Sequence, residues 1–187
     1  MKSLVLIWVV LLSSIIIAIA APLGKVVKIA NGITRIDFTG DGVPDMVISG
    51  HRENNNAHSF DVVSFYVPVK DGTAATNEWN IVPIMGKKKE ELTISVSGGA
   101  DCLLHDFRLL IGKGKDAAVL VVADREFGDN FASEAPVTFA FYSLNHSTDQ
   151  IPGVPTYSFE QSHVSKSKVK YCDVGEALLK ELGLGKR

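Results

Sequence analysis

Apolar and polar residues alternate in short runs along most of the chain after residue 24, and clusters of glycine, proline, asparagine and aspartate separate these runs. Runs of this kind, rich in β-branched and aromatic residues, are typical of strands that bury one face. The pattern predicts a mostly β domain of antiparallel sheets, arranged as a sandwich or barrel-like structure. We expect strands at residues 25–30, 33–37, 45–49, 58–69, 79–85, 92–97, 102–111, 117–124 and 136–144.

Two local signals refine this pattern. Asn31-Gly32 lies between the first two expected strands and predicts a tight hairpin there. Periodicity alone leaves residues 102–111 compatible with a helix, and the neighbouring strands favour a strand.

The end of the chain predicts a single short helix. Asp173 is suited to cap its N-terminus, with Glu176 three residues later, and Gly183 or Gly185 is suited to end it. We expect its apolar face to consist of Leu178, Leu179 and Leu182.

The N-terminal segment has a different character. Lys2 is followed by an almost unbroken apolar run that ends in the small-residue pattern Ala18-Ile19-Ala20. This predicts a signal peptide at residues 1–20 and a single β-rich domain at 21–187, which is periplasmic or secreted and has no mature membrane span. The alternative is an uncleaved membrane anchor, because the apolar run is long for a signal peptide.

Composition and cysteine content agree with one exported domain. The chain has 187 residues, 46% of them hydrophobic, and a formal net charge of −2, so it offers no basic surface for nucleic acid. Cys102 and Cys172 are its two cysteines. In an oxidising compartment we expect them to form a disulfide, and two buried free thiols are the alternative.

The stretch DFTGDGVPD, residues 37–45, predicts a calcium site. Calcium takes oxygen ligands from carboxylates, hydroxyls and carbonyls, and glycine at residue 42 permits the sharp turn such loops need. The loop resembles the calcium loops of FG-GAP and VCBS-type β repeats, although threonine replaces the usual Asp or Asn at its third position and should weaken affinity. The alternative is a metal-free turn whose aspartates bond their own backbone. The candidate ligands are Asp37, Thr39, Asp41, the Val43 carbonyl and Asp45.

No catalytic motif is complete, so we expect no enzyme and no catalytic residues. Ser165 and Lys168 form a Ser-x-x-Lys pair, but it lies in a polar run and lacks the companion motifs of β-lactamases. The five histidines include no pair with the spacing of a zinc site.

Two mixed polar and aromatic stretches, 51–61 and 123–136, predict a ligand or partner surface. Either stretch alone is compatible with an ordinary solvated loop, and their joint presence favours binding. The candidate contacts are Arg52, His58, Arg125 and Asp129.

The chain resembles the periplasmic carbapenem self-resistance proteins over about residues 28–145. The resemblance is carried by the stretch from Asn31 to Val67 and by the motifs HDFRLL, ADREFGDN and APVTFAFYSL. It implies non-catalytic protection by binding a carbapenem or a periplasmic protein target. Arg52 and Arg125 suit the carboxylate of such a drug, since arginine binds carboxylates bidentately. The alternative is a calcium-stabilised secreted β module that binds a surface partner or glycan.

Overall fold

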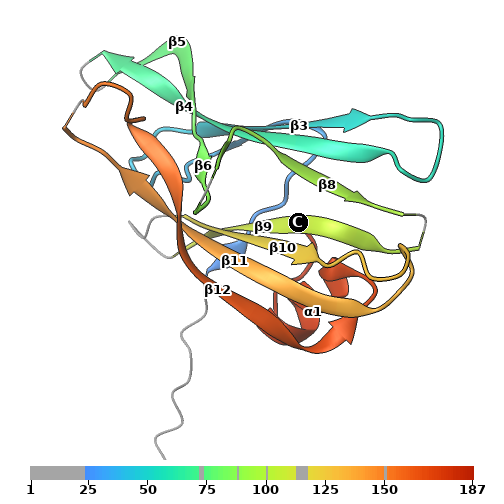
Figure 1. The fold of residues 1–187 in the computed structure, drawn as a ribbon. Helices are drawn as coiled ribbons and strands as arrows, with labels where there is room; N and C mark the ends of the chain where they lie inside the picture. The colour runs from blue at the N-terminus through green and yellow to red at the C-terminus, as the bar shows by residue number, and fades with distance from the viewer. Residues whose placement is uncertain (1–23, 72–73, 88, 100, 113–117, 150) are drawn as a thin grey trace, which may run out of the picture.

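A computed structural model describes residues 24–71, 74–87, 89–99, 101–112, 118–149 and 151–187 of the chain. The predicted signal peptide at residues 1–20 lies outside these ranges. Strands dominate the described residues, which confirms the mostly β prediction (Figure 1). The strands are β1 (Lys25–Val26), β2 (Gly32–Ile36), β3 (Asp45–Arg52), β4 (Phe60–Asp71), β5 (Ala74–Ile81), β6 (Ile84–Met85), β7 (Glu90–Glu91), β8 (Ile94–Gly98), β9 (Leu103–Ile111), β10 (Val119–Arg125), β11 (Ala135–His146) and β12 (Tyr157–Tyr171), and the helix is α1 (Val174–Leu182).

The strands form one continuous sheet in the order β2-β3-β4-β8-β9-β10-β11-β12-β6-β7, with β5 beside β4 and β1 beside β9. The sheet folds over at β8 and forms two layers (Figure 1). The upper layer contains β3 and β4, and it faces the lower layer, which contains β9, β10 and β11. It does not close into a barrel. Neighbouring strands run antiparallel as predicted, except that β12 and β6 are parallel through Phe159 and Ile84.

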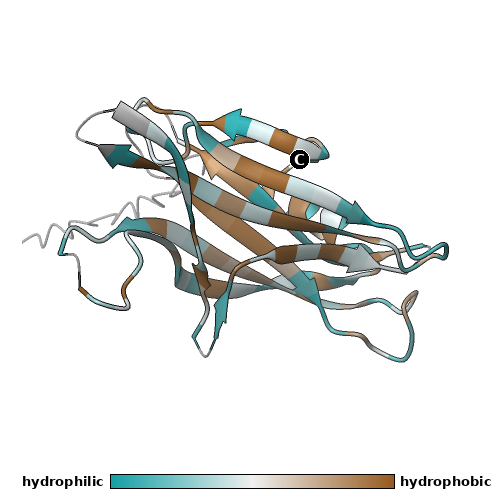
Figure 2. Ribbon diagram, turned by 90° about the horizontal axis from the view of Figure 1, so that it is seen from above, coloured by the Kyte–Doolittle hydropathy of each residue, from teal (hydrophilic) through white to brown (hydrophobic). Residues whose placement is uncertain are grey.

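The space between the layers holds the larger hydrophobic core. Apolar and polar residues alternate along many of the strands (Figure 2). Because successive side chains of a strand point to opposite faces, this alternation gives each layer an apolar face toward the core. Phe65 lies at the centre of this core, with its ring centroid 5.2 Å from that of Phe159 and 6.1 Å from that of Phe107, both in edge-to-face geometry. Such aromatic pairs add stabilisation beyond their buried area, and they fix the spacing of the layers.

A second core lies between the outer face of the lower layer and α1. The Asp173 carboxylate caps the helix by accepting from the N–H groups of Gly175 and Glu176, and Gly183 ends it at φ 70°, as predicted. Leu178 is buried against the sheet, but Leu179 is 55% exposed, so the prediction that both share one apolar face is wrong for Leu179. Among the described residues, no helix combines the length and apolar character needed to cross a membrane.

The predicted hairpin at Asn31-Gly32 is wrong. Lys25 and Val26 pair with β9 in the lower layer, whereas Gly32–Ile36 pairs with β3 in the upper layer. The segment between them crosses from one layer to the other and buries Val27 and Ile29 in the core on its way. Burial of these two side chains therefore overrides the local turn signal.

The strand predictions also missed β12 and joined two elements into one. β12 pairs with β11 along most of its length, yet most of its side chains are exposed, so it lacks the apolar alternation that identifies a half-buried strand. The predicted strand at 79–85 is interrupted at Val82 and Pro83 between β5 and β6. Proline has no N–H to donate to a ladder, which accounts for the break.

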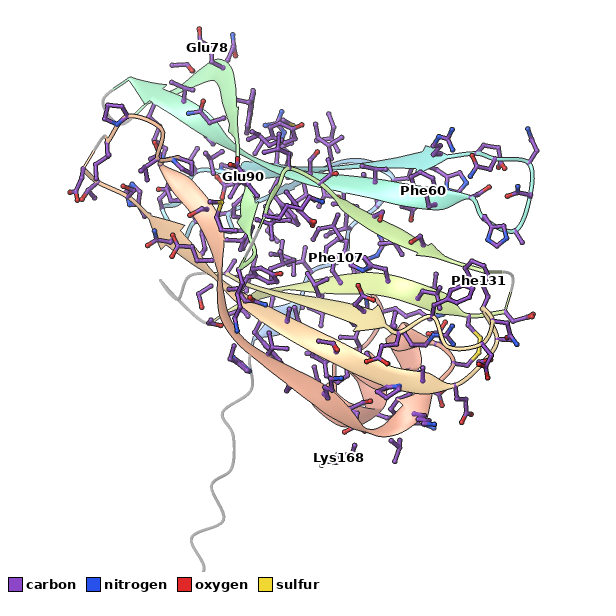
Figure 3. All side chains as sticks on the ribbon, viewed as in Figure 1. Phe60, Glu78, Glu90, Phe107, Phe131 and Lys168 are labelled. Carbon is purple, nitrogen blue, oxygen red and sulfur yellow. A yellow bond between two sulfur atoms is a disulfide. The ribbon has the colours of Figure 1, made fainter. Side chains whose placement is uncertain are left out.

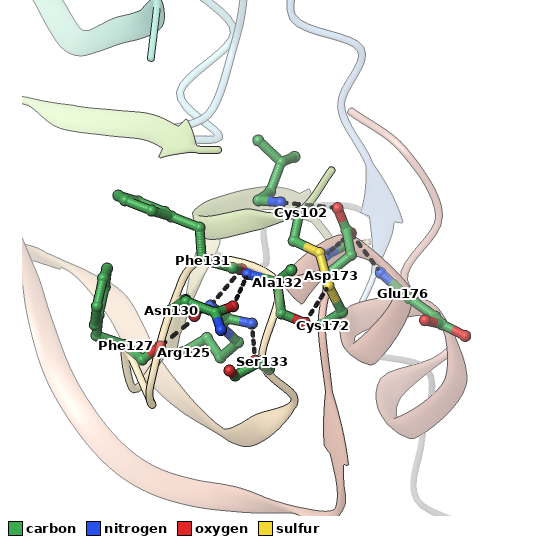
Figure 4. Close-up of a disulfide and its surroundings, with 12 residues drawn as sticks. Cys102, Arg125, Phe127, Asn130, Phe131, Ala132, Ser133, Cys172, Asp173 and Glu176 are labelled. Carbon is green, nitrogen blue, oxygen red and sulfur yellow. Dashed lines mark hydrogen bonds between the residues drawn. A yellow bond between two sulfur atoms is a disulfide. The ribbon is translucent and has the colours of Figure 1, made fainter. Parts of the chain in front are cut away.

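The predicted disulfide is present. Cys102 lies just before β9 and Cys172 lies between β12 and α1, and their Cα atoms are 5.5 Å apart. The bond closes a separation of 70 residues and attaches the start of α1 to the sheet (Figures 3 and 4).

We predict that replacing both cysteines by alanine lowers the free energy of unfolding by about 4 kcal/mol, because the bond restricts a long loop in the unfolded chain. Urea denaturation of the oxidised wild type and of the double variant measures the difference. Wild type unfolded in the presence of a thiol reductant is the control and should match the double variant. A loss below about 1 kcal/mol would contradict the chain-entropy argument.

Candidate functional site

Three connections meet at one end of the molecule. They are the β3–β4 loop (53–59), the β8–β9 connection and the β10–β11 loop (126–134) (Figure 1). The His58 ring packs on the Phe131 ring with centroids 4.8 Å apart, and His58 Nδ1 lies 3.2 Å from the Gly98 carbonyl oxygen. The structure therefore brings together the two polar stretches that the sequence analysis singled out separately.

Two phenylalanines stand exposed on this end. Phe127 is 51% exposed and Phe131 is 38% exposed, and their rings pack edge to face with centroids 4.9 Å apart. Figure 3 labels Phe131 at the end of the molecule. We call Phe127, Phe131 and His58 the aromatic tip. Rigid aromatic side chains beside polar groups are typical of surfaces that bind ligands or partners.

The Arg125 guanidinium holds the β10–β11 loop from beneath. The side chain is only 2% exposed, and its N–H groups donate to the carbonyls of Ser133 and, at 2.8 Å, Phe131. Longer contacts of 3.5 Å reach the carbonyls of Phe127 and Asn130 (Figure 4). These charge-assisted hydrogen bonds satisfy carbonyls that no strand neighbour reaches, so they set the shape of the loop.

The electrostatic setting of Arg125 is unusual. Within the described part of the chain no carboxylate forms an ion pair with this guanidinium, and its buried Nε has no hydrogen-bond partner. Burial lowers the pKa of Arg125 from its ordinary value. Arginine nevertheless stays charged in proteins, so the loop is built around a buried cation that backbone carbonyls solvate.

The disulfide supports the same loop from the other side. Cys172 Sγ lies 3.4 Å from the Ala132 carbonyl oxygen, and Asp173 Oδ2 accepts from the Leu103 N–H at 3.0 Å (Figure 4). The disulfide and the Asp173 hydrogen bond thus join the start of β9 to the cap of α1, and the β10–β11 loop lies in contact with the disulfide. The backbone that carries Phe127 and Phe131 is therefore held by Arg125 and lies against the disulfide.

The four predicted contact residues have different positions. His58 belongs to the aromatic tip, and Asp129 is exposed in the same loop as Phe127. Arg52 is exposed, with its guanidinium carbon 5.5 Å from the centroid of the Phe60 ring. Arg125 is buried, so a carboxylate could reach it only by displacing the carbonyls it holds.

A charged pocket of about 660 Å³ lies on a side that the sequence analysis did not anticipate. It is enclosed by β8, β9, α1 and the residues after α1. The lining residues are Val96, Leu103, Asp106, Arg108, Asp173, Gly175, Glu176, Leu179, Gly185, Lys186 and Arg187.

A network of charges forms the floor of this pocket. Arg108 is 2% exposed and its Nη1 donates to Asp106 Oδ2 at 2.6 Å. Arg187 Nε lies 3.3 Å from Asp106 Oδ1, and its Nη2 lies 2.9 Å from Asp61 Oδ2 in the upper layer. Burial raises the pKa of Asp61, but hydrogen bonds from His51 and Arg187 outweigh burial and hold the pKa below its usual range.

One signal for this network was present in the sequence. Asp106 and Arg108 occupy alternate positions of an otherwise largely apolar strand, so they point to the same face. A buried charge requires a partner, and two opposite charges on one buried face indicate a paired interior site. Nothing local marks Arg187, whose partners lie 81 and 126 residues away.

The acidic loop joins β2 to β3, as predicted, at the opposite end of β3 from residues 53–59. The Asp37 carboxylate accepts from the N–H groups of Gly40 at 2.7 Å and Gly42 at 2.8 Å. Asp45 Oδ2 accepts from Phe38 at 2.8 Å and from Thr39 at 2.9 Å. Backbone N–H groups therefore supply much of the positive potential that keeps these carboxylates together.

The remaining carboxylate in this loop, that of Asp41, pairs with the Lys70 ammonium. Burial raises the pKa of Asp41, but the bonds from Lys70 and the Val43 N–H outweigh burial and lower it overall. Burial raises the pKa of Asp45 to about 6, and its buried Oδ1 has no hydrogen-bond partner.

The oxygen atoms of this loop could coordinate a calcium ion only if the Lys70 ammonium moved away from the Asp41 carboxylate. Asp45 Oδ1 is buried and accepts no hydrogen bond, which favours a bound cation at this oxygen. The Lys70 ammonium already supplies a positive charge to the loop, which argues against a cation. The described residues contain no group of three His, Cys, Asp or Glu side chains arranged to hold a metal. Calcium binding by this loop stays a prediction.

The fold and its loop-borne aromatic tip define a class: an open two-layered β protein that presents its candidate binding surface on loops. A protein-family model described as "Carbapenem resistance protein CarG-like" matches residues 29–180, so the chain belongs to the CarG-like family. The match includes the acidic loop, the aromatic tip and most of the charged pocket, but not Gly185, Lys186 and Arg187.

Structural comparison agrees with this membership. The chain is similar to a solved structure titled "Crystal structure of CarG", with a TM-score of 0.70 and 26% sequence identity. The alignment covers 87% of this chain and 99% of the other. No curated protein matches the chain.

We predict that Arg125→Met lowers the free energy of unfolding by about 3 kcal/mol, because it removes the donors of several buried carbonyls. It should also speed chymotrypsin cleavage after Phe127 and Phe131 under native conditions. Denaturation curves and timed digestion are the measurements. Arg52→Met is the matched control, since that side chain is exposed and its loss should change stability by less than about 0.5 kcal/mol. Equal digestion rates for both variants would show that Arg125 does not hold the β10–β11 loop in place.

We predict that calcium stabilises the folded chain and that a chelator lowers its melting temperature, because a ligand that binds only the folded state stabilises it by mass action. Asp41→Ala should abolish the response, and Lys70→Met should enlarge it by removing the competing cation. Asp129→Ala, an exposed aspartate outside the loop, should respond as wild type does. Identical melting curves of wild type in calcium and in chelator would retire the calcium site.

Proposed function

We propose that this protein is an exported, non-catalytic carbapenem-protection protein that acts by binding the drug or a target of the drug. The observation that carries the proposal is family membership combined with a structural likeness that spans nearly all of the CarG chain. The alignment covers 99% of that chain, so the likeness is not confined to one part of it.

The surroundings of the reactive side chains support a binding mechanism. Ser165 and Lys168 lie on β12, whereas a Ser-x-x-Lys pair needs a helix to place both side chains on one face. Within the described residues, His51 and His105 contact the carboxylates of Asp61 and Asp124, and neither contacts a hydroxyl or a thiol. A nucleophilic hydroxyl or thiol requires a base within hydrogen-bond reach, and neither His51 nor His105 serves as the base of such a pair.

The aromatic tip supports a contact surface for a ligand or partner. Its rings are exposed, yet the backbone that carries them is held by the Arg125 guanidinium and the disulfide. A surface that is already ordered loses less conformational entropy on binding, so more of the contact energy remains as affinity. The disulfide also fits an oxidising compartment, which agrees with the predicted export.

The proposal predicts protection that rises with the amount of protein and is overwhelmed at high drug dose. The test expresses the full-length chain from an inducible promoter in a carbapenem-sensitive host and measures survival across drug concentrations. A variant lacking residues 1–20 is the control for export and should not protect. Loss of the drug's ultraviolet absorbance with purified wild type, abolished by Ser165→Ala, would overturn the binding mechanism and restore an enzyme.

A matched pair of variants tests the aromatic tip in the same assay. Phe127→Ala should lower the protected drug concentration several-fold, since it removes an exposed ring from the proposed surface. Ile151→Ala truncates another apolar side chain of 51% exposure elsewhere and should leave protection unchanged. Equal survival of both strains would exclude the tip from the function.

A further inference from the structure

We propose that the charged pocket beside α1 binds a small organic carboxylate with an apolar body. The pocket is defined by the lining residues given above, and its volume of about 660 Å³ lies within the range of pockets that enclose small ligands. This inference rests on the proposed function only where the carboxylate is that of a carbapenem. The site itself is argued from the pocket alone.

The walls of the pocket divide into an apolar and a polar part. Val96 from β8, Leu103 from β9 and Leu179 from α1 supply apolar surface, and the 55% exposed Leu179 would be covered by an occupant. Arg108 and Arg187 supply the polar part. A ligand that satisfies both parts has a charged end and a hydrophobic body.

The guanidinium groups have donors to spare. Arg108 uses Nε on the Gly185 carbonyl and Nη1 on Asp106 and the Phe107 carbonyl, and within the described residues its Nη2 makes no hydrogen bond. Arg187 uses Nε on Asp106 and Nη2 on Asp61, which leaves Nη1 without a partner in the same set of residues. Each arginine therefore retains a terminal nitrogen that can donate to a ligand.

The carboxylates of the pocket are already engaged by donors of the protein. Asp106 accepts from Arg108, Arg187 and the Phe107 N–H. Asp173 caps α1 through the N–H groups of Gly175 and Glu176 and also accepts from the Leu103 N–H. Glu176 pairs with Lys180 at 2.6 Å on the helix surface.

The unused guanidinium nitrogens favour an anionic ligand, although the lining also contains the carboxylates of Asp106, Asp173 and Glu176. Two guanidiniums share the Asp106 carboxylate, and Lys186 adds a third positive charge among the lining residues. An anion with two oxygen acceptors satisfies the spare nitrogens, and carboxylate geometry matches the guanidinium fork. A cation would have to compete with protein donors, since Asp106 and Asp173 each already accept three hydrogen bonds.

Binding is tested on protein purified from cells that express the full chain, with benzoate, its neutral isostere benzamide and a carbapenem as probes in titration calorimetry. We expect benzoate to bind with one-to-one stoichiometry and benzamide at least tenfold more weakly. Arg187→Gln should weaken benzoate at least tenfold, because it removes the positive charge and the guanidinium fork. Lys170→Gln, which removes an exposed cation on β12 outside the pocket lining, is the matched control and should bind as wild type does.

Arg108→Lys keeps the buried charge but loses the fork, and it should also weaken benzoate. If that variant fails to fold, Arg187→Gln and Lys186→Gln carry the test. Failure of both carboxylates to bind, equal affinity for benzamide, or an unaffected Arg187→Gln variant would each overturn the site.

The results with the two probes, benzoate and the carbapenem, distinguish this inference from the proposed function. Benzoate binding without carbapenem binding supports a general carboxylate site and removes the pocket as a drug site. If the carbapenem binds and Arg187→Gln weakens that binding at least tenfold, the pocket is supported as a site for the carboxylate of the drug. Bacterial survival that persists in the Arg187→Gln strain, combined with benzoate binding lost in the pure variant, supports the pocket and places protection elsewhere on the molecule.

Discussion

The aromatic tip and the charged pocket depend on the double pairing of β8. It bonds to β4 on one edge and to β9 on the other, and it is therefore the point where one sheet becomes two layers. A sheet folded in this way must fill the space between its inner faces, and the cluster around Phe65 does so. The same fold places the loop after β3 beside the loop after β10, and it positions Val96 over the pocket beside α1. The aromatic tip and the charged pocket both follow from the fold at β8.

Local signals were sufficient for the elements whose stability is local. The cap and end of α1 were predicted because Asp173 and Gly183 satisfy helix termini through neighbouring atoms. The disulfide was predicted because an exported chain with two cysteines has one possible pairing. The hairpin at Asn31-Gly32 and the strand β12 were misjudged because their outcome depends on the other layer and on pairing with β11, which no short window of sequence contains.

The candidate site shows the same division. The two polar stretches were recognisable, but their contact through His58 and Phe131 depends on the topology of the sheet. Arg125 was expected at the surface, since arginine is rarely buried without an acidic partner. It is buried because carbonyl oxygens of its own loop replace that partner. The pocket was missed because it combines Arg108 with Arg187, and their proximity is decided by the path of the chain after α1.

The pairing of Lys70 with Asp41 gives the acidic loop a counterion that cannot diffuse away. A tethered group acts at an effective concentration that reaches about the millimolar range, independent of the surrounding medium. Any dissolved cation entering this loop must first displace an ion that is already attached to the chain. If the loop does take up a divalent ion, the tethered ammonium would restrict that uptake to a medium in which such ions are abundant.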